Sequence, residues 1–498
     1  MTVTGQIRRG AYFDSVTLMR VGRELSAMPG VADAAVVMGT RANKAILDTS
    51  GLLVSEFSRA GDTDLLVAVR ADSPKAAATA MAKVDSLLKS ATKKASESGA
   101  VNASSLEDAL KALPGANMAV ISVAGRYAGD VAFQCLENGL HVMLFSDNVP
   151  LEKEIELKKF AAKKGLLVMG PDCGTAIING APLAFANVVR RGPIGVVAAA
   201  GTGLQEVSSI IANEGSGISQ AIGTGGRDVK KDVGGIMFVE GLKALAADPE
   251  TKVILLVSKP PHKAVLRRIN GLLKKIRKPV VTRFIGDGAG TLEEAALTAV
   301  ALARGEKADA AAKRLAARDA DILKTAGRVK PGKGRKYVRG LFSGGTFCAE
   351  AQIILAGMLR DIYSNAPAGG AKQLRNSLKS QKHTMVDLGE DEFTQGRPHP
   401  MIDYSLRNKR ILEEAKDPET AVILLDVVLG YGSNLDPAAE LSPVIREAAR
   451  KVAVVCSVTG TDADPQDRGK VAAALKKAGA IVMPSNAAAC KLAGWIVK

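Results

Sequence analysis

The feature that most constrains the fold of this chain is a recurring order of apolar strand, glycine turn and helix. The segment Ile194–Ala198 leads into Gly201-Thr202-Gly203 and a helix, and Tyr337–Phe342 leads into Ser343-Gly344-Gly345-Thr346 and a second helix. A third segment, Ala119–Val123, reaches a glycine at position 125 in the same way. Strands that are apolar throughout and alternate with helices are typical of parallel sheets buried on both faces. The chain is therefore predicted to be an α/β protein.

Four domains are predicted, because 498 residues are too many for one core at about 150 residues per domain. Residues 1–114 should form an α+β module, and residues 115–190 a Rossmann-like domain. Residues 191–330 and 331–498 repeat the same order of strand, glycine turn, helix and later strand, which indicates two flavodoxin-like domains. The basic Gly/Pro stretch 327–336 is interpreted as the linker between them.

Composition narrows the classes of partner. Lys and Arg exceed Asp and Glu by 67 − 51 = 16. A solvated basic surface is the first interpretation of this charge, and attraction of anionic substrates is the second. Nucleic-acid binding is disfavoured, because aromatic residues make up only 4% and no zinc-finger or RNP-like signature accompanies the charge.

Cysteine usage and hydropathy indicate a cytoplasmic protein. The five cysteines are widely spaced without a CxxC pair, which supports neither a disulfide framework nor a zinc ribbon. The N-terminus carries no apolar signal region, and runs such as Val253–Val257 are too short to span a bilayer. We expect no membrane partner.

The glycine turns are the candidate binding site. A turn between a buried strand and a helix presents unpaired N–H groups, and the helix dipole adds partial positive charge there. Glycine lets an anion approach the backbone, while Ser and Thr add hydroxyl donors. The alternative is that every βα unit needs a small-residue turn. None of the turns is GxGxxG, so NAD is not indicated. The predicted ligand-binding residues are Gly125, Arg126, Tyr127, Gly201, Thr202, Gly203, Ser343, Gly344, Gly345 and Thr346.

Several longer motifs carry a family resemblance. They are Tyr12–Val16, Phe145–Pro150, Gly170–Gly180, Asp391–Asp403 and Leu425–Gly432. In these segments the chain resembles the FdrA family, which is related to the succinyl-CoA synthetases. The resemblance covers nearly the whole chain. It implies a CoA-binding-type domain at residues 115–190, followed by two ligase-type domains whose glycine-turn helices point at one phosphate.

One departure from that pattern affects the chemistry. The synthetases carry a phosphorylated histidine in a Gly-His-Ala-Gly context, and the corresponding stretch here, residues 286–290, has no histidine. No ATP-grasp domain is apparent either. A phosphate site without a relay histidine suits a ready-made donor such as carbamoyl phosphate.

The resemblance also implies an activity. Members of the FdrA family are linked to oxamate carbamoyltransfer in allantoin breakdown, with companion subunits. The predicted function is therefore a subunit of an oxamate-type carbamoyltransferase that binds carbamoyl phosphate or phosphate and works as an oligomer. The alternatives are a component of an ADP-forming acyl-CoA synthetase, with CoA as ligand, and a non-catalytic CoA- or metabolite-binding scaffold. No metal is predicted.

Charged side chains supply the catalytic candidates. Arg227, Arg397 and Lys259 are candidate clamps for phosphate or an acceptor carboxylate. His399 is a candidate for orienting or protonating a reactant near neutral pH. Of these, His399, Arg397 and Arg227 are predicted as catalytic. The alternative for each is surface charge or loop structure.

Two further groups have competing interpretations. A cluster of acids is either a cation or acid–base site or, as we favour, a structural network in loops; its members are Asp391, Glu392, Asp403 and Asp426. Cys173 is either a nucleophile or a buried packing residue. The second is favoured, because no paired base is evident.

Overall fold

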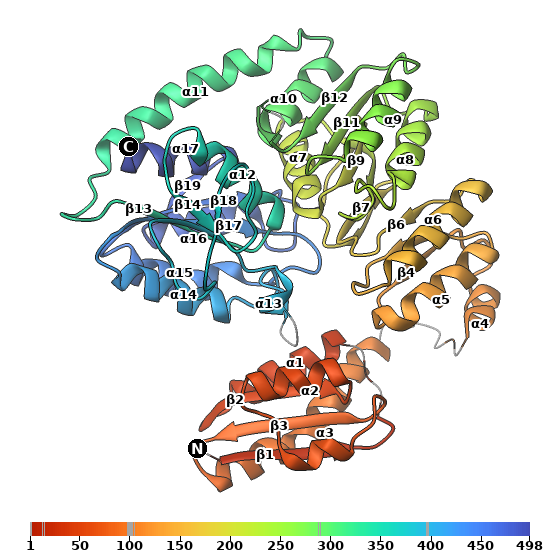
Figure 1. The fold of residues 1–498 in the computed structure, drawn as a ribbon, viewed down its shortest axis with the longest axis vertical. Helices are drawn as coiled ribbons and strands as arrows, with labels where there is room; N and C mark the ends of the chain where they lie inside the picture. The colour runs from red at the N-terminus through yellow and green to blue at the C-terminus, as the bar shows by residue number, and fades with distance from the viewer. Residues whose placement is uncertain are drawn as a thin grey trace. The chain divides into compact units, whose positions relative to one another are not determined.

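The chain divides into two compact units. The computed structural model describes residues 2–11, 13, 15–96, 103, 105–286, 288, 290–394 and 398–498. Residues 1–115 and 391–399 form the first unit, and residues 116–390 and 400–498 form the second (Figure 1). Parallel sheets covered by helices make up the second unit, which confirms the predicted α/β class. No helix of the described residues is long and apolar enough to cross a membrane.

The first unit is an α+β module around a three-stranded antiparallel sheet of order β1-β3-β2. Side chains of the central strand alternate between its two faces. Leu65, Val67 and Val69 pack with α1 and α3, whereas Leu66 and Ala68 pack with residues of α2 and η1. The elements are β1 (Thr2–Arg8), α1 (Ser15–Ser26), β2 (Val31–Met38), α2 (Arg41–Thr49), η1 (Ser55–Arg59), β3 (Leu65–Ala71), α3 (Pro74–Ser96), α4 (Leu106–Ala112) and α13 (Asp391–Thr394).

The second unit begins with a small parallel sheet of order β4-β5-β6. Its strand order runs in one direction without reversing. The elements are β4 (Met118–Ile121), α5 (Gly125–Glu137), β5 (His141–Leu144), α6 (Leu151–Lys164) and β6 (Val168–Met169).

The next sheet has the order β12-β11-β9-β10-β7-β8. Its four longer strands are parallel, and the hairpin β7–β8 joins them by antiparallel pairing with β10. The predicted boundary at residue 190 therefore falls after two strands that belong to this sheet. The elements are β7 (Thr175–Ile178), β8 (Ala181–Ala184), β9 (Arg191–Ala199), α7 (Gly201–Asn213), β10 (Ile218–Gly223), α8 (Ile236–Ala247), β11 (Val253–Ser258), α9 (Lys263–Leu273), β12 (Val280–Phe284) and α10 (Leu292–Ala303).

A long helix, α11 (Asp309–Arg328), leads to the last sheet, which is parallel with the order β15-β14-β16-β13-β17-β18-β19. Its inner strand β17 is buried along its whole length. The elements are β13 (Tyr337–Phe342), α12 (Gly345–Ala356), β14 (Ile362–Ser364), β15 (Lys372–Gln373), β16 (His383–Asp387), α14 (Ser405–Lys416), β17 (Thr420–Val428), α15 (Pro437–Ala448), β18 (Ala453–Thr459), α16 (Arg468–Lys477), β19 (Ile481–Met483) and α17 (Asn486–Val497).

Candidate functional site

The two predicted glycine turns lie at equivalent places in their sheets. β9 stands between β10 and β11, and β13 stands between β16 and β17, so the strand order reverses at both. The order β10-β9-β11-β12 is the flavodoxin-like 2-1-3-4 arrangement, and β16-β13-β17-β18 resembles it, with β14 and β15 added outside β16. In that arrangement ligands bind outside the carboxyl end of the first strand. The turns at residues 201–203 and 344–346 follow those two strands directly. The topology therefore places both turns where a ligand is expected.

Neither helix is capped by the side chain of its own N-cap residue. α7 starts after Ala200 and α12 starts after Gly344, and neither residue supplies a side-chain hydrogen bond. By contrast, Thr291 and Asp436 cap α10 and α15. The first-turn N–H groups of α7 and α12 have no intrahelical acceptor, so an anion is a natural partner for them.

The two turns face each other at close range. A methyl group added at Gly344 would stand 2.8 Å from both Oγ1 and Cγ2 of Thr202. One added at Gly203 would stand 2.9 Å from Cγ2 of Thr346. Glycine is needed at both positions, because any Cβ would push the two helix ends apart. The structure thus brings together the two turns that the sequence singled out.

Two buried glutamates hold the helices α7 and α12 in this arrangement. Each follows its Gly-Thr by four positions, at Glu206 and Glu350. Glu206 accepts from the Thr459 hydroxyl (2.6 Å) and the Asn486 N–H (2.9 Å) of the last domain. Glu350 accepts from the Leu292 N–H of the preceding domain (2.8 Å). Burial raises the pKa of Glu206 to about 7.

Some of the predicted anion-binding donors already donate hydrogen bonds to a side chain of the protein. The buried carboxylate of Asp426 accepts from the Ser343 N–H (2.8 Å), the Ser343 hydroxyl (2.9 Å) and the Gly344 N–H (2.9 Å). Arg407 donates to the same carboxylate at 3.1 Å and stacks on Tyr404. Ser343 and Gly344 therefore shape the turn, and Gly345 and Thr346 are the residues there with N–H groups to offer. Asp426 acts as a structural partner, as favoured from the sequence.

A carboxyl group and a lysine complete the site. Asp387, at the end of β16, is 3% exposed, and its Oδ1 accepts from the Gly389 N–H at 2.9 Å. A methyl group at Gly345 would stand 2.6 Å from its Oδ2, so this oxygen lies at the start of α12. Lys259, on the loop after β11, is exposed, and its charge lowers the pKa of Asp387. We call these groups the paired-turn site: residues 201–203 and 344–346, Lys259 and Asp387.

Arg227 lies elsewhere in the second unit and braces two domains. Its Nε pairs with Glu154 of α6 at 2.8 Å, and its NH2 group donates to the Val149 carbonyl at 2.8 Å. The same glutamate accepts from the buried Lys158, which also contacts Asp228 at 2.9 Å. These contacts account for Arg227 as a structural residue, and its role as a clamp stays a prediction.

The third predicted turn has a different environment. Gly125 packs against the backbone of residues 147–148, where a Cβ would collide with the Asp147 carbonyl. Arg126 stacks over the ring of its neighbour Tyr127 at 4.7 Å. Since the β4-β5-β6 order does not reverse, this sheet offers no switch point beside the turn.

The histidines are not part of the paired-turn site in the described residues. His141 and His383 each begin a strand and accept a backbone N–H, and His262 caps α9. His399 belongs to the first unit, and burial lowers its pKa to about 4, so it is neutral at pH 7. Arg397 lies outside the described residues. The catalytic roles of His399 and Arg397 stay predictions.

The remaining candidates have structural surroundings. All five cysteines are buried, and burial raises the pKa of Cys173 to about 12, which disfavours a nucleophile. Asp403 caps its own turn by accepting from the Ser405 N–H. Asp391 and Glu392 lie on α13 of the first unit. Throughout the described part of the chain, no group of three or more His, Cys, Asp or Glu side chains could hold a metal ion.

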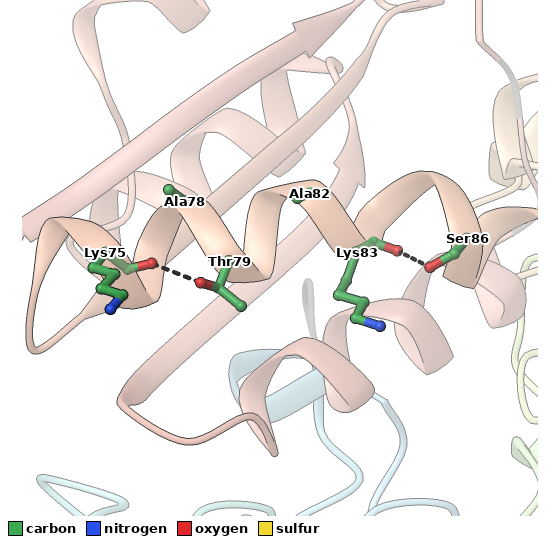
Figure 2. Close-up of a pocket in the computed structure, with 6 residues that line it drawn as sticks. All are labelled: Lys75, Ala78, Thr79, Ala82, Lys83 and Ser86. Carbon is green, nitrogen blue, oxygen red and sulfur yellow. Dashed lines mark hydrogen bonds between the residues drawn. The ribbon is translucent and has the colours of Figure 1, made fainter.

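A shallow hollow lies along the exposed face of α3 in the first unit (Figure 2). Two lysines and four small side chains line it: Lys75, Ala78, Thr79, Ala82, Lys83 and Ser86. Both hydroxyls donate to carbonyls of their own helix, as the dashed lines show. The polar groups of this surface are therefore used locally, and they do not converge on a ligand.

Asp387, Glu206 and Glu350 were not predicted as functional residues from the sequence. Their only local signals are an acid at the carboxyl end of an apolar strand, in His383–Asp387, and the repeated Gly-Thr-x-x-x-Glu spacing. Both signals indicate a role at the site only when the structure shows that the two turns meet.

Comparison with known proteins defines the class. Residues 341–496 match the family model described as CoA-ligase. The alpha 1 subunit of succinate–CoA ligase [ADP-forming] of Archaeoglobus fulgidus is 29% identical over 41% of this chain and 70% of that protein. The ADP-forming sulfoacetate–CoA ligase subunit SauD of Bilophila wadsworthia is 28% identical over 28% of this chain and 50% of its own length. Residues 341–496 are therefore similar to a CoA-ligase domain, and part of the chain is similar to subunits of ADP-forming CoA ligases.

The particular family follows from a full-length relative. The uncharacterized protein YahF of Escherichia coli K12 is 41% identical over 98% of this chain and 97% of that protein. The chain belongs to the same family as this protein. Among solved structures, a dinucleotide-forming acetyl-coenzyme A synthetase of Ca. Korarchaeum cryptofilum aligns with 76% of this chain and 82% of its own, at 17% identity and a TM-score of 0.30.

The first unit has its own match. Residues 1–106 match the family model described as AllF, heavy metal-associated domain. Soft heavy metals prefer thiolate and imidazole ligands. This stretch of sequence contains neither cysteine nor histidine. The residues present do not fit such a metal.

Proposed function

We propose that this chain is the phosphate-binding subunit of an oxamate-type carbamoyltransferase, which passes the carbamoyl group of carbamoyl phosphate to a small carboxylate-bearing acceptor. One observation carries the proposal. Two helix N-termini whose N-cap residues supply no side-chain cap meet at two switch points, one of them against Asp387, on whose pKa the charge of Lys259 acts. Such a site suits a phosphate-bearing ligand, and none of the histidines described in the second unit is part of it.

The site can support acyl-type transfer from a ready-made donor. The N–H groups at the starts of α7 and α12 would hold the phosphate, and Lys259 would offset its charge. Fixed donors of this kind stabilise charge as it develops on a leaving phosphate, and positioning of the two reactants lowers the barrier further. Arg227, Arg397 and His399 stay candidates for holding the acceptor or moving its proton, and the turn at residues 125–127 stays a candidate for a further anionic group.

The second candidate is a component of an ADP-forming acyl-CoA synthetase. The CoA-ligase match over residues 341–496 favours it. Two features weigh against it: the lack of a histidine at residues 286–290, and a β4-β5-β6 sheet without the switch point at which doubly wound folds bind nucleotides. Because the curated relatives are named as subunits, we expect companion subunits for either activity.

The decisive test measures phosphate release from carbamoyl phosphate with oxamate as acceptor. The chain is assayed alone and co-expressed with the products of neighbouring genes, beside a Gly345→Ala variant. The added methyl would press on Oδ2 of Asp387. It should lower the rate by about 100-fold or more, because small displacements at a reacting centre have effects of that size.

Gly357→Ala is the matched control at the other end of α12, where a methyl meets only ordinary contacts. It should change the rate by less than about twofold. Acyl-CoA formation from ATP, CoA and a carboxylate, without oxamate-dependent phosphate release, would replace the transferase with the ligase. Binding of carbamoyl phosphate or CoA with neither activity in any subunit combination would leave a metabolite-binding scaffold.

A further inference from the structure

We infer that Asp387 is the acid–base group of the paired-turn site: it takes up a proton when a tetrahedral dianion binds and gives up or receives that proton during transfer. The inference rests on the proposed function for the place of the anion. It goes further in naming the group that replaces a histidine there.

The geometry of Asp387 carries the first step. Its carboxyl group is 3% exposed, and one oxygen is fixed by the Gly389 N–H at 2.9 Å. The other oxygen, Oδ2, makes no hydrogen bond with the described residues and lies against Gly345, the first residue of α12. An anion held at this helix start comes within contact range of Oδ2. Since no described residue hydrogen-bonds this oxygen, it is available to a ligand bound at the start of α12.

Contact with a bound dianion determines the protonation state of Asp387. A carboxylate beside a dianion would repel it, whereas a carboxylic acid donates a short hydrogen bond to it. Asp387 is suited to switch between the two forms. Burial and the charges of Glu390 and Asp426 raise its pKa, while the Gly389 N–H and Lys259 lower it, and the result is about 7. Burial raises the pKa of the Cys348 thiol on α12, and the charge of Asp387 raises it further.

The same proton serves the transfer step. The acceptor nitrogen attacks the carbamoyl carbon, a C–N bond forms, and the bond from that carbon to the phosphate oxygen breaks with its electron pair on phosphate. The protonated Asp387 gives its proton to the leaving phosphate, and the carboxylate so formed takes up the proton that the nitrogen loses. Carbamoyl phosphate and a primary amine or amide thus give the carbamoylated acceptor and hydrogen phosphate, with Asp387 returned to its starting form. Acid–base help of this kind contributes about 10²–10⁴-fold in rate.

Sulfate binding to the full chain tests the proton uptake without any turnover. Sulfate is a tetrahedral dianion that does not titrate near neutral pH, unlike inorganic phosphate. Calorimetry in two buffers of different ionisation enthalpy, between about pH 6 and pH 8.5, measures the protons taken up on binding. We expect about one proton per sulfate above pH 7, and an affinity that falls about tenfold per pH unit there.

The variants separate Asp387 from its surroundings. Asp387→Asn keeps the acceptor for Gly389 and a donor for the anion, so it should bind sulfate with a flat pH profile and no proton uptake. Glu390→Gln should keep the slope and move its onset to lower pH, because Glu390 raises the pKa of Asp387. Asp361→Asn, a surface carboxylate paired with Lys372 and Lys382, should leave the profile unchanged.

The outcomes are distinguishable. If sulfate binds to neither the natural protein nor Asp387→Asn, the anion site itself and the proposed function fail. If sulfate binds without proton uptake, or Asp387→Asn keeps the pH dependence of the natural protein, the anion site survives and the role of Asp387 is overturned. In an active complex, Asp387→Asn should lower kcat far more than it changes KM; equal losses in both would count against proton transfer.

Discussion

At the scale of single residues, burial decides which charged side chains have a structural part. Lys158 is fully buried in α6, where its ammonium contacts Glu154 at 2.8 Å, Asp228 at 2.9 Å and the Thr224 carbonyl at 3.0 Å. Asp228 in turn accepts from the first N–H groups of α8. One ammonium therefore joins the small parallel sheet to the sheet that follows it.

Replacing Lys158 by methionine should lower the free energy of unfolding by about 3–5 kcal/mol, because the buried carboxylate of Asp228 loses its counter-charge and that of Glu154 keeps only Arg227. Urea denaturation followed by circular dichroism measures the loss. Lys159→Met, at the exposed neighbouring position, should stay within about 0.5 kcal/mol of the natural protein. Equal effects of the two substitutions would show that the buried network contributes nothing.

The same scale shows where sequence reasoning reached its limit. Ser343 and Gly344 were predicted as anion donors from their local pattern, but a carboxylate 82 or 83 residues away, on Asp426, accepts their hydrogen bonds. Local sequence cannot reveal such a partner, because it depends on which strands become neighbours. For the same reason the pattern identified the turns but gave no sign that Asp387 stands beside them.

At the scale of elements, the pairing of α7 with α12 should depend on pH through Glu206. Its pKa is about 7 in the folded protein, against an ordinary value of 4.5. Between these values the folded state binds more protons than the unfolded state, so this residue's contribution to stability falls as the pH rises.

Glu206→Gln removes that titration. The stability of the variant relative to the natural protein should improve by on the order of 1–3 kcal/mol between about pH 5 and pH 8. Denaturant midpoints across this range, compared pairwise, measure the difference and cancel the other titrating groups. Glu240→Gln, a surface residue paired with Lys243, should give a constant difference. A constant difference for Glu206→Gln as well would contradict the raised pKa.

Strand and helix order was well predicted at this scale. Tyr337–Phe342 is β13 as expected, and Ile194–Ala198 lies within β9. Apolar runs followed by glycine are strong local signals. The predicted boundary at residue 190 assigns the hairpin at residues 175–184 to the preceding domain, whereas it pairs with β10. This pairing is a tertiary contact, which the local sequence does not indicate.

At the scale of the whole molecule, the two flavodoxin-like domains are joined by apolar packing and by buried hydrogen bonds. Ala349 of α12 belongs to the core of the preceding domain. Asp464 accepts from Asn187 and from the Val188 N–H across the boundary. Separating the halves would expose apolar surface and leave buried carboxylates without donors.

Fragments 175–330 and 331–498, expressed separately, should therefore lack a cooperative thermal transition, and mixing them should restore one. Calorimetry on each fragment and on the mixture measures this. The intact chain serves as the reference for the transition to be recovered. Two fragments that each melt cooperatively on their own would show that the halves are independent folding units.

The helix α11 has a consequence for how such a site is supplied in a cell. It is 20 residues long, about 30 Å at 1.5 Å per residue, and it keeps both halves on one polypeptide. A tether of this length fixes the local concentration of one half around the other at about the millimolar level. Each completed chain thus contains one N-terminus of α7 and one of α12, so the two are always made in equal number. Assembly of the pair is insensitive to dilution, to gene dosage and to the order in which messages are translated.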